Sequence, residues 1–144
     1  MSAPVETIVS VTRFRLRSLR FLPFFTLHTN RTIAQTRKAE GFLAGAVRRE
    51  ADLAFWTMTV WRDEQAMRAY AASGAHRKAA PHLAEWGDQA SVCHWTQEGS
   101  GLPEWPEAVR RLRVVGRPLR LKHPALDHAE RGFAESKMSY GMRL

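Results

Sequence analysis

Hydrophobic and polar residues alternate along the first patterned segment of the chain, VETIVSVTRFRL (5–16). Val9 and Val11 fall on one face of this segment, and Ile8 and Phe14 fall on the other. Alternation with a period of two residues, in a segment rich in β-branched side chains, is typical of a strand. We therefore predict a strand over these residues.

The period changes to that of a helix after this strand. Ser18 is a suitable N-cap, and apolar residues then recur at helical spacing to about Ala39, with His28 on the apolar side. Pro23 is tolerated only in the first turn of a helix, and Gly41 is typical of the position after a helix end. This pattern predicts a helix between Ser18 and Ala39.

Two more strands are predicted by FLAGAVRRE (42–50) and LAFWTMTVW (53–61). The connection between them is so short that they should form an antiparallel hairpin. Along the second strand, Phe55 and Trp61 point to one face and Trp56 points to the other. Both faces of this strand are therefore apolar or aromatic.

The next segment predicts a broken helix and a last strand. Asp63 is a suitable N-cap, Ser73-Gly74 interrupts the helical spacing, and a second helical piece runs from about Ala75 to Trp86 with a bend at Pro81. ASVCHWTQE (90–98) is the fourth strand. The order β-α-β-β-α-β predicts a ferredoxin-like α+β fold with a four-stranded antiparallel sheet.

The character of the chain changes after Gly99. The segment that follows is rich in Pro, Gly and Arg, and it contains one predicted short helix, at 104–113. We expect two parts, a ferredoxin-like domain at 1–99 and a basic C-terminal extension at 100–144. The extension is expected to pack on the domain or on a partner subunit.

Composition narrows the class of protein. The chain has 144 residues, 44% of them hydrophobic and 25% charged, as in an ordinary globular domain. Its one cysteine, Cys93, excludes an internal disulfide framework and a cysteine-based zinc site, and fits the reducing cytoplasm.

His76 and His82 do not share a helical face, so we predict no metal site. No apolar run is long enough for a membrane-spanning helix.

The formal net charge of +8 raises the question of an anionic partner. The arginines are spread over several segments, and no zinc finger, RNP sequence, GxxG loop or helix-turn-helix signature accompanies them. A solvated basic surface explains this charge better than a nucleic-acid interface does. We therefore do not expect nucleic-acid binding.

A four-stranded sheet with both helices on one face would leave its other face bare. Because residues 53–61 are apolar on both sides, such a face would expose hydrophobic side chains, which usually mark an interface. We predict a homodimer in which two sheets pack face to face or curl into a shared barrel. The space between each sheet and its helices is where small ligands of such proteins tend to bind.

The segment TMTVWRDEQAMRAYAASGAHRKA (57–79) resembles the dimeric α/β-barrel superfamily, especially antibiotic-biosynthesis-monooxygenase-like proteins. The extension is similar to that of spheroidene-monooxygenase-like uncharacterised proteins. The resemblance spans residues 5–98 well and the extension weakly. It implies a dimeric α/β barrel and three classes of activity: cofactor-independent oxygenation of electron-rich aromatic molecules, haem degradation, or small-molecule isomerisation and dehydration.

Haem degraders similar in sheet pattern use an Asn in the first strand, a Trp in the helix after the third strand, and a His about ten residues further on. The first strand here has no Asn, Tyr70 stands at the helical position, and the histidine is His76 or His82. The resemblance therefore disfavours haem degradation and leaves haem binding through a histidine open. The cofactor expected is none or haem.

These patterns lead to a set of candidate site residues. His76 follows a helix break and is a candidate base or haem ligand, and Tyr70 is a candidate for binding a substrate oxygen. The residues expected to line a cleft for a small hydrophobic or aromatic ligand are Trp61, Trp56, His28, Trp95 and Trp86. Ordinary core packing explains most such aromatic residues equally well. The function is therefore a monooxygenase-like enzyme or a non-catalytic dimeric binding module of the same fold.

Overall fold

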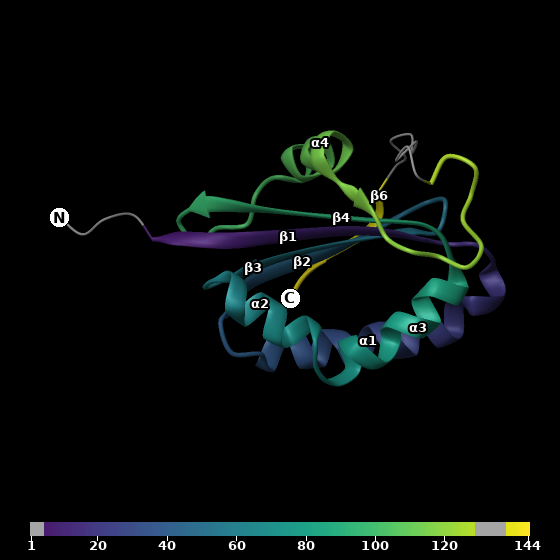
Figure 1. Cartoon of the computed structure of the whole chain (residues 1–144), viewed down its shortest axis with the longest axis horizontal. Helices are drawn as coiled ribbons and strands as arrows, with labels where there is room; N and C mark the ends of the chain where they lie inside the picture. Colours follow the sequence, from purple (N-terminus) through teal and green to yellow (C-terminus); the bar gives the residue numbers. More distant parts are fainter. Residues whose placement is uncertain (1–4, 129–137) are drawn as a thin grey trace.

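The structure is a computed structural model that describes residues 5–128 and 138–144 (Figure 1). Its helices are a short 3-10 turn (Leu19–Phe21) followed by α1 (Leu22–Lys38), α2 (Glu64–Ala71), α3 (Gly74–Trp86) and α4 (Trp105–Val115). Its strands are β1 (Glu6–Leu16), β2 (Phe42–Glu50), β3 (Ala54–Trp61), β4 (Gly87–Glu98), β5 (Arg117–Pro118) and β6 (Met138–Arg143). The predicted α+β class and the ferredoxin-like order of elements are confirmed.

Local signals explain where several of these elements begin and end. Ser18 accepts a hydrogen bond from the backbone of Arg20 at the 3-10 turn, and Asp63 accepts one from the backbone of Ala66 at the start of α2. Both bonds satisfy amide groups that a helix start leaves unpaired. Gly41 adopts a φ of 84°, a left-handed conformation that costs glycine little.

All strand pairs are antiparallel, and the strand order is β5-β4-β1-β3-β2-β6. The sheet therefore has six strands, and the prediction of four was wrong in this respect. The two added strands lie at the two edges, where β5 pairs with β4 and β6 pairs with β2. Sequence pattern missed them because β5 has only two residues and β6 follows a long segment without strand periodicity.

The sheet has helices on both faces (Figure 1). The helices α1, α2 and α3 lie on one side, and α4 lies across the other side over β4 and β1. Ala108, Val109 and Leu112 of α4 are buried against a core that includes Trp56 and Met58 of β3. The expectation of a bare second face was therefore wrong, because a helix of the chain itself covers it.

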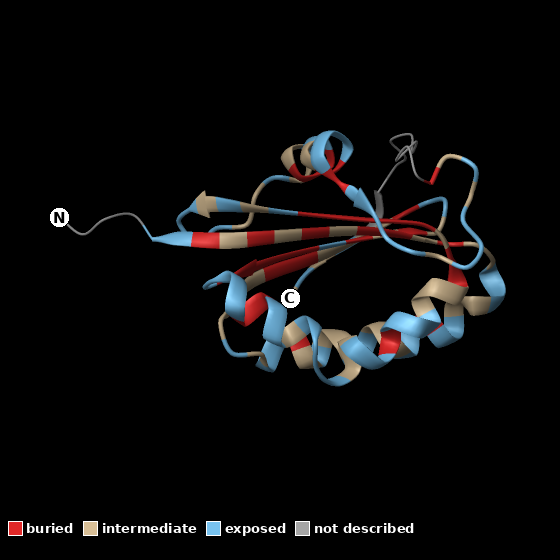
Figure 2. Ribbon diagram, viewed as in Figure 1, coloured by how far each residue is buried: buried red, intermediate tan, exposed pale blue. Residues whose placement is uncertain are grey.

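Burial follows these layers along each strand (Figure 2). In the central strand β1, Val9 and Val11 belong to the core under α4, whereas Phe14 and Leu16 belong to a cluster with α1 and α3. A third cluster, centred on Trp61, packs against α2. None of the described helices is long and apolar enough to cross a bilayer.

Candidate functional site

The middle of the sheet carries hydroxyl side chains on the face that α1, α2 and α3 cover. Ser10 of β1 pairs with Thr59 of β3, and Thr12 pairs with Thr57, so the four side chains lie together on one face. Thr57 is exposed although its strand lies inside a six-stranded sheet. We call these four residues the hydroxyl row. Thr59 is buried, and Ser10 and Thr12 are half-buried. The exposure of Thr57 shows that the helices leave this part of the sheet uncovered.

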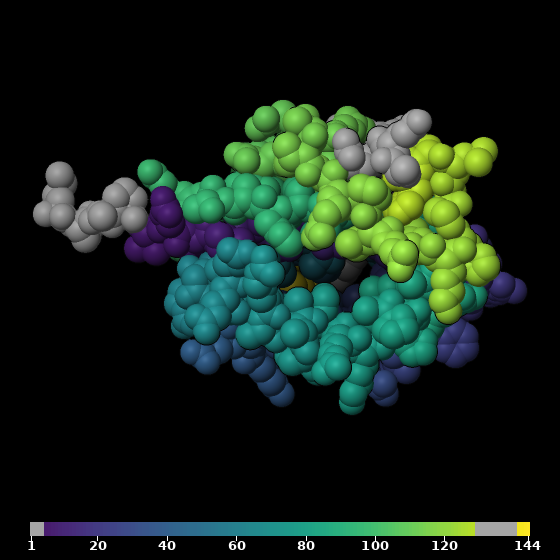
Figure 3. Space-filling view, viewed as in Figure 1, coloured from purple at the N-terminus to yellow at the C-terminus, as the bar shows by residue number. Residues whose placement is uncertain are grey.

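Figure 3 shows a hollow at this level, between α2 and α3 on one side and the extension on the other. His94 of β4 pairs with Ser10 and is also exposed on this face. On α1, Phe25 and Thr36 are buried, and helical spacing places Thr32 on the same side between them. The space between this side of α1 and the hydroxyl row is the cleft.

Aromatic clusters stand at both ends of the hydroxyl row. At one end, Phe25 of α1 stacks on Phe14 at a ring-centroid distance of 5.4 Å and contacts Phe55 at 4.5 Å. At the other end, Trp61 contacts Phe42 at 5.6 Å and Tyr70 at 4.8 Å. The cleft is therefore polar in its middle and aromatic at its ends.

Trp61, Tyr70 and His76 form one continuous chain of rings. The Tyr70 ring lies 4.8 Å from that of Trp61 and 5.0 Å from that of His76. The Trp61 indole N–H donates to the Thr59 hydroxyl at 2.9 Å, which ties the chain to the hydroxyl row. Three residues expected at the site, from β3, α2 and α3, are thus brought together.

The Tyr70 hydroxyl is hydrogen-bonded to the hydroxyl of Thr36 on α1 at 2.6 Å. Burial raises the pKa of the Tyr70 phenol, so it stays protonated at neutral pH. The side chain thus joins α2 to α1 at the edge of the cleft. In this arrangement Tyr70 positions its neighbours, and its expected bond to a substrate oxygen stays a prediction.

His76 is oriented by two hydrogen bonds. Its backbone N–H donates to Oε1 of Gln35 at 2.8 Å, and its Nδ1 lies 3.1 Å from the carbonyl oxygen of Ala71. Because a carbonyl only accepts, Nδ1 carries the proton and Nε2 carries the lone pair. Burial lowers the pKa of the imidazole. His76 is therefore a neutral group with one basic nitrogen at neutral pH.

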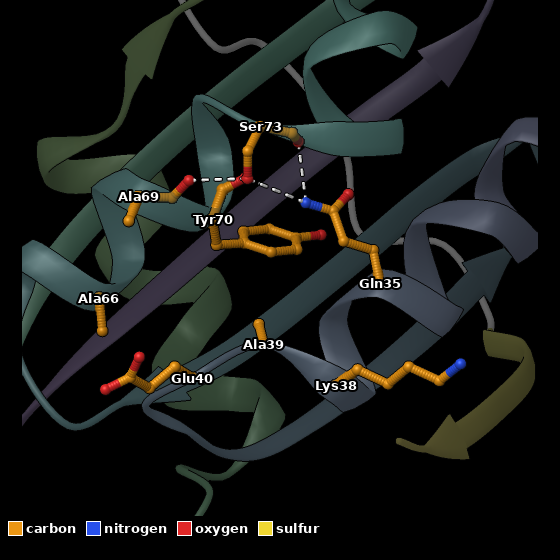
Figure 4. A pocket seen from close by; sticks show the side chains of 8 residues that line it. All are labelled: Gln35, Lys38, Ala39, Glu40, Ala66, Ala69, Tyr70 and Ser73. Carbon is orange, nitrogen blue, oxygen red and sulfur yellow. Dashed lines mark hydrogen bonds between the residues drawn. The ribbon is translucent and has the colours of Figure 1, made fainter.

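A surface pocket of about 390 Å³ lies on the outer side of Tyr70 (Figure 4). It separates the end of α1 from α2, and its lining residues are Gln35, Lys38, Ala39, Glu40, Ala66, Ala69, Tyr70 and Ser73. Gln35 spans one wall, where its Nε2 donates to the carbonyl of Ser73 at 2.8 Å. The pocket therefore reaches the same Tyr70 and Gln35 that position His76.

His28 and Trp86 lie in a separate cluster of rings between α1 and α3. The His28 ring is 5.4 Å from Trp86 and 4.9 Å from His82. Burial lowers the pKa of His28, and the nearby His82 and Arg31 lower it further. The structure thus keeps this pair with the aromatic cluster at the Phe25 end, away from His76.

Trp56 and Trp95 lie on the other face of the sheet. The Trp56 indole N–H donates to Glu50 at 2.5 Å, and its ring contacts Trp105 of the extension at 6.4 Å. Trp95 lies under the guanidinium of Arg111, at 4.6 Å. The sheet therefore separates both residues from the cleft that they were expected to line, because they occupy strand positions of the opposite parity.

Haem does not fit the surroundings of His76. The Tyr70 ring occupies the space 5.0 Å from the imidazole, and the floor beyond it carries hydroxyls where a porphyrin needs an apolar wall. Among the residues that the structure describes, no group of three or more His, Cys, Asp or Glu side chains is placed to hold a metal ion.

Sequence reasoning missed the hydroxyl row, Gln35 and Thr36. The row had a visible signal, because Ser10 and Thr12 interrupt the apolar residues of a central strand and Thr57 and Thr59 do the same on its neighbour. Gln35 and Thr36 had none, because each acts through a hydrogen bond to a residue more than thirty positions away.

Solved structures share this fold. A conserved protein from Methanosarcina mazei matches with a TM-score of 0.57 at 19% identity, over 63% of this chain and 92% of its own. SnoaB, a cofactor-independent oxygenase from Streptomyces nogalater, matches with a TM-score of 0.51 at 24% identity, over 68% of this chain and 98% of its own. A candidate antibiotic biosynthesis monooxygenase from Nitrosomonas europaea matches with a TM-score of 0.54 at 11% identity, over 70% of this chain and 94% of its own. The fold is therefore monooxygenase-like, as the resemblance predicts.

No curated protein matches this chain in sequence. A protein family described as a domain of unknown function, DUF3291, matches residues 25–118. The matched part runs from α1 through β5 and includes the ring chain, β3 and α4. The chain therefore belongs to the DUF3291 family.

Proposed function

We propose that the protein is a monooxygenase-like enzyme that binds a small hydroxylated aromatic molecule in the cleft and needs no cofactor. The observation that carries the proposal is the hydroxyl row, with Thr57 exposed at its centre, between two aromatic clusters. Aromatic side chains at the ends suit the faces and edges of a flat ring system. Hydroxyls in the middle suit its phenolic or quinone oxygens. The oxygenase activity named for SnoaB supports the same class of reaction.

His76 acts as the base in this proposal. Its neutral imidazole takes a proton through Nε2 from an activated methylene of the substrate. The resulting carbanion reduces O₂, one oxygen atom becomes the carbonyl of the product, and the other leaves as water. The balance is R₂CH₂ + O₂ → R₂C=O + H₂O, with the substrate as the reductant. Trp61 and Tyr70 hold the imidazole and the substrate in place.

The test is oxygen consumption with a tricyclic phenol that carries such a methylene. We expect uptake of one O₂ per product carbonyl, with a rate at least about a hundred-fold lower in His76→Ala. Arg77→Gln, a change of the adjacent exposed residue, serves as the control and keeps the wild-type rate. Uptake that His76→Ala leaves unchanged, in a protein with an unchanged melting temperature, would contradict the role of His76.

The second candidate is a non-catalytic binding module. Tyr70 and His76 favour it, because each makes a hydrogen bond within the protein that a purely structural role would explain. In that case the same phenol quenches tryptophan fluorescence on binding, while oxygen consumption stays at the level of buffer.

We also propose a homodimer, but with a different contact surface from the one that the sequence predicted. Because α4 covers the sheet face that was expected to pair, a face-to-face dimer would have to displace it. Strand β6 offers another route, since β2 is its one strand neighbour in the described sheet and its outer edge is open to a second copy. Light scattering at micromolar concentration should give twice the chain mass of 16.4 kDa. A mass near 16 kDa would exclude the dimer.

A further inference from the structure

Gln35 of α1 reaches both sides of residues 72–73, the α2–α3 break, with one amide group (Figure 4). Its Nε2 donates to two carbonyl oxygens at the end of α2 and in the break, those of Tyr70 at 3.3 Å and Ser73 at 2.8 Å. Its Oε1 accepts from the backbone N–H of His76, in the first turn of α3, at 2.8 Å. Because carbonyls only accept and an amide N–H only donates, one orientation of the side chain satisfies all three bonds. Gln35 thus caps two helix ends from a third helix.

The α2–α3 break is built in a way that gives this capping role to Gln35. Ser73 stands at the N-cap of α3, where a serine hydroxyl usually accepts an N–H of the first turn. Here the hydroxyl donates back to the carbonyl of Ala69 in α2, at 2.9 Å. Gly74 begins α3 with a φ of 61°, and a Cβ at this position would lie 3.0 Å from the amide of Gln35. Ser73 and Gly74 therefore interrupt the helix and also leave room for the amide.

The side chain of His76 spans the same break. Its backbone belongs to α3, whereas its Nδ1 lies 3.1 Å from the carbonyl oxygen of Ala71, the last residue of α2. That bond requires a proton on Nδ1 and leaves Nε2 basic. The distance between Nδ1 and the carbonyl depends on how the two helix ends are set relative to each other. Gln35 is bonded on both sides of the break, so the choice of tautomer should depend on its amide.

We propose that Gln35 is a positioning residue: it holds the α2–α3 break in one geometry and thereby fixes which nitrogen of His76 is basic and where that nitrogen lies. Gln35 acts on the reaction through His76, and only this last step rests on the proposed function. A surface glutamine kept for solubility would turn its amide to water. Here both the oxygen and the nitrogen of the amide are bonded to backbone groups of the break.

The first experiment is nitrogen NMR of the histidine side chains in the full chain at pH 8, with the His76 signals assigned by their absence from His76→Ala. In the wild type we expect the Nδ1–H tautomer to dominate. Gln35→Met keeps the length of the side chain and removes all three bonds, so the signals should shift toward a mixture of both tautomers. Gln65→Met, the same exchange at an exposed position of α2, is the matched control and should leave the tautomer unchanged.

A second variant keeps the amide but withdraws it from the break. Gln35→Asn is one methylene shorter, so its amide cannot reach both helix ends, and we expect the same shift toward mixed tautomers. The wild-type tautomer in a folded Gln35→Met or Gln35→Asn variant would overturn the proposal. A lower melting temperature with an unchanged tautomer would likewise overturn it, because Gln35 would then have a structural role alone.

Oxygen uptake with the tricyclic phenol measures the catalytic consequence. Gln35→Met should lower kcat by roughly ten- to a hundred-fold and keep KM within about three-fold, because the base is displaced while the floor of the cleft is unchanged. If the wild type takes up no oxygen, the proposed function is wrong, and the tautomer experiment still decides the role of Gln35. If the wild type is active and Gln35→Met keeps its kcat, the positioning role is wrong and the proposed function stands.

Discussion

The two faces of the sheet are built in different ways. On the α4 side, apolar side chains from β1, β3 and β4 close tightly around Trp56, and a buried ionic group lies beside it. On the side of α1 and α3, two aromatic clusters flank the hydroxyl row, and Thr57 of this row is exposed between them. One face thus holds the fold together, and the other contains the space where a ligand would bind. Stability and function should therefore respond to different substitutions.

The buried ionic group gives the largest expected effect. Glu50 is buried, and its carboxylate lies 3.7 Å from Arg13 and 3.5 Å from Arg48. Removing one partner of a buried pair leaves the other charge without its main compensation. Arg13 keeps an ion pair with Asp52 at 3.6 Å, so the loss concerns the buried carboxylate that it shares with Arg48. Glu50→Leu should lower the free energy of unfolding by about 3–5 kcal/mol, as measured by urea denaturation. Binding of a phenol in the cleft should persist in the folded fraction, and its loss there would show that the two faces are coupled.

The contact of α4 with the sheet gives the next effect. Leu112 is fully buried in the core on this side. Leu112→Ala should cost about 2–5 kcal/mol, because a cavity remains where the side chain was. Leu119→Ala, at a partly exposed position of the same extension, is the matched control and should change the unfolding free energy by less than about 1 kcal/mol. Equal effects of the two changes would argue against α4 as a structural part of the domain.

The stability of the folded protein should depend on pH through His76, which lies on the side of the sheet that contains the cleft. Burial lowers the pKa of this imidazole from the ordinary value of 6.5, so the folded protein binds the proton less tightly than the unfolded chain does. The resulting stability is present above pH 6.5 and declines as the pH falls toward the folded pKa. His28 and His94 have lowered pKa values too and contribute in the same direction. Thermal unfolding of His76→Gln from pH 5 to 8 should therefore show a weaker pH dependence than the wild type, and an identical profile would contradict this assignment.

The smallest expected change in stability comes from the hydroxyl row itself. Thr57 is exposed, so Thr57→Val should alter the free energy of unfolding by no more than about 0.5 kcal/mol. The affinity for a phenolic ligand should fall nevertheless, because one hydrogen-bonding group of the floor is lost. Fluorescence titration measures that affinity. Thr96→Val, at another exposed position on β4 and farther from the row, is the control. No difference between the two variants would exclude Thr57 from the binding site.

The comparison of the faces also shows how far sequence reasoning reaches. The class and order of elements were predictable, because alternation, caps at Ser18 and Asp63, and the stop at Gly41 all act within a few residues. Trp61, Tyr70 and His76 were each named as candidate site residues, and their rings lie in contact. Their role in binding or catalysis stays a prediction. The place of α4 was not, because its amphipathic pattern shows that one side is buried without showing what covers it. Trp56 and Trp61 were predictable as lying on opposite faces of the sheet, because side chains alternate along a strand. Which of the two faces holds the cleft depends on the placement of the helices, which the alternation does not show.

The central position of β1 has a consequence for the way the protein is made. This strand pairs with β3 on one side and with β4 on the other, so that Glu6 lies opposite Glu98. A growing chain can form the β2–β3 hairpin early, since its two strands are neighbours in sequence. The first strand, however, keeps one hydrogen-bonding edge open until almost a hundred residues have been synthesised. Long-range pairing of this kind slows folding, and during that interval the nascent sheet exposes an edge to which other chains can add.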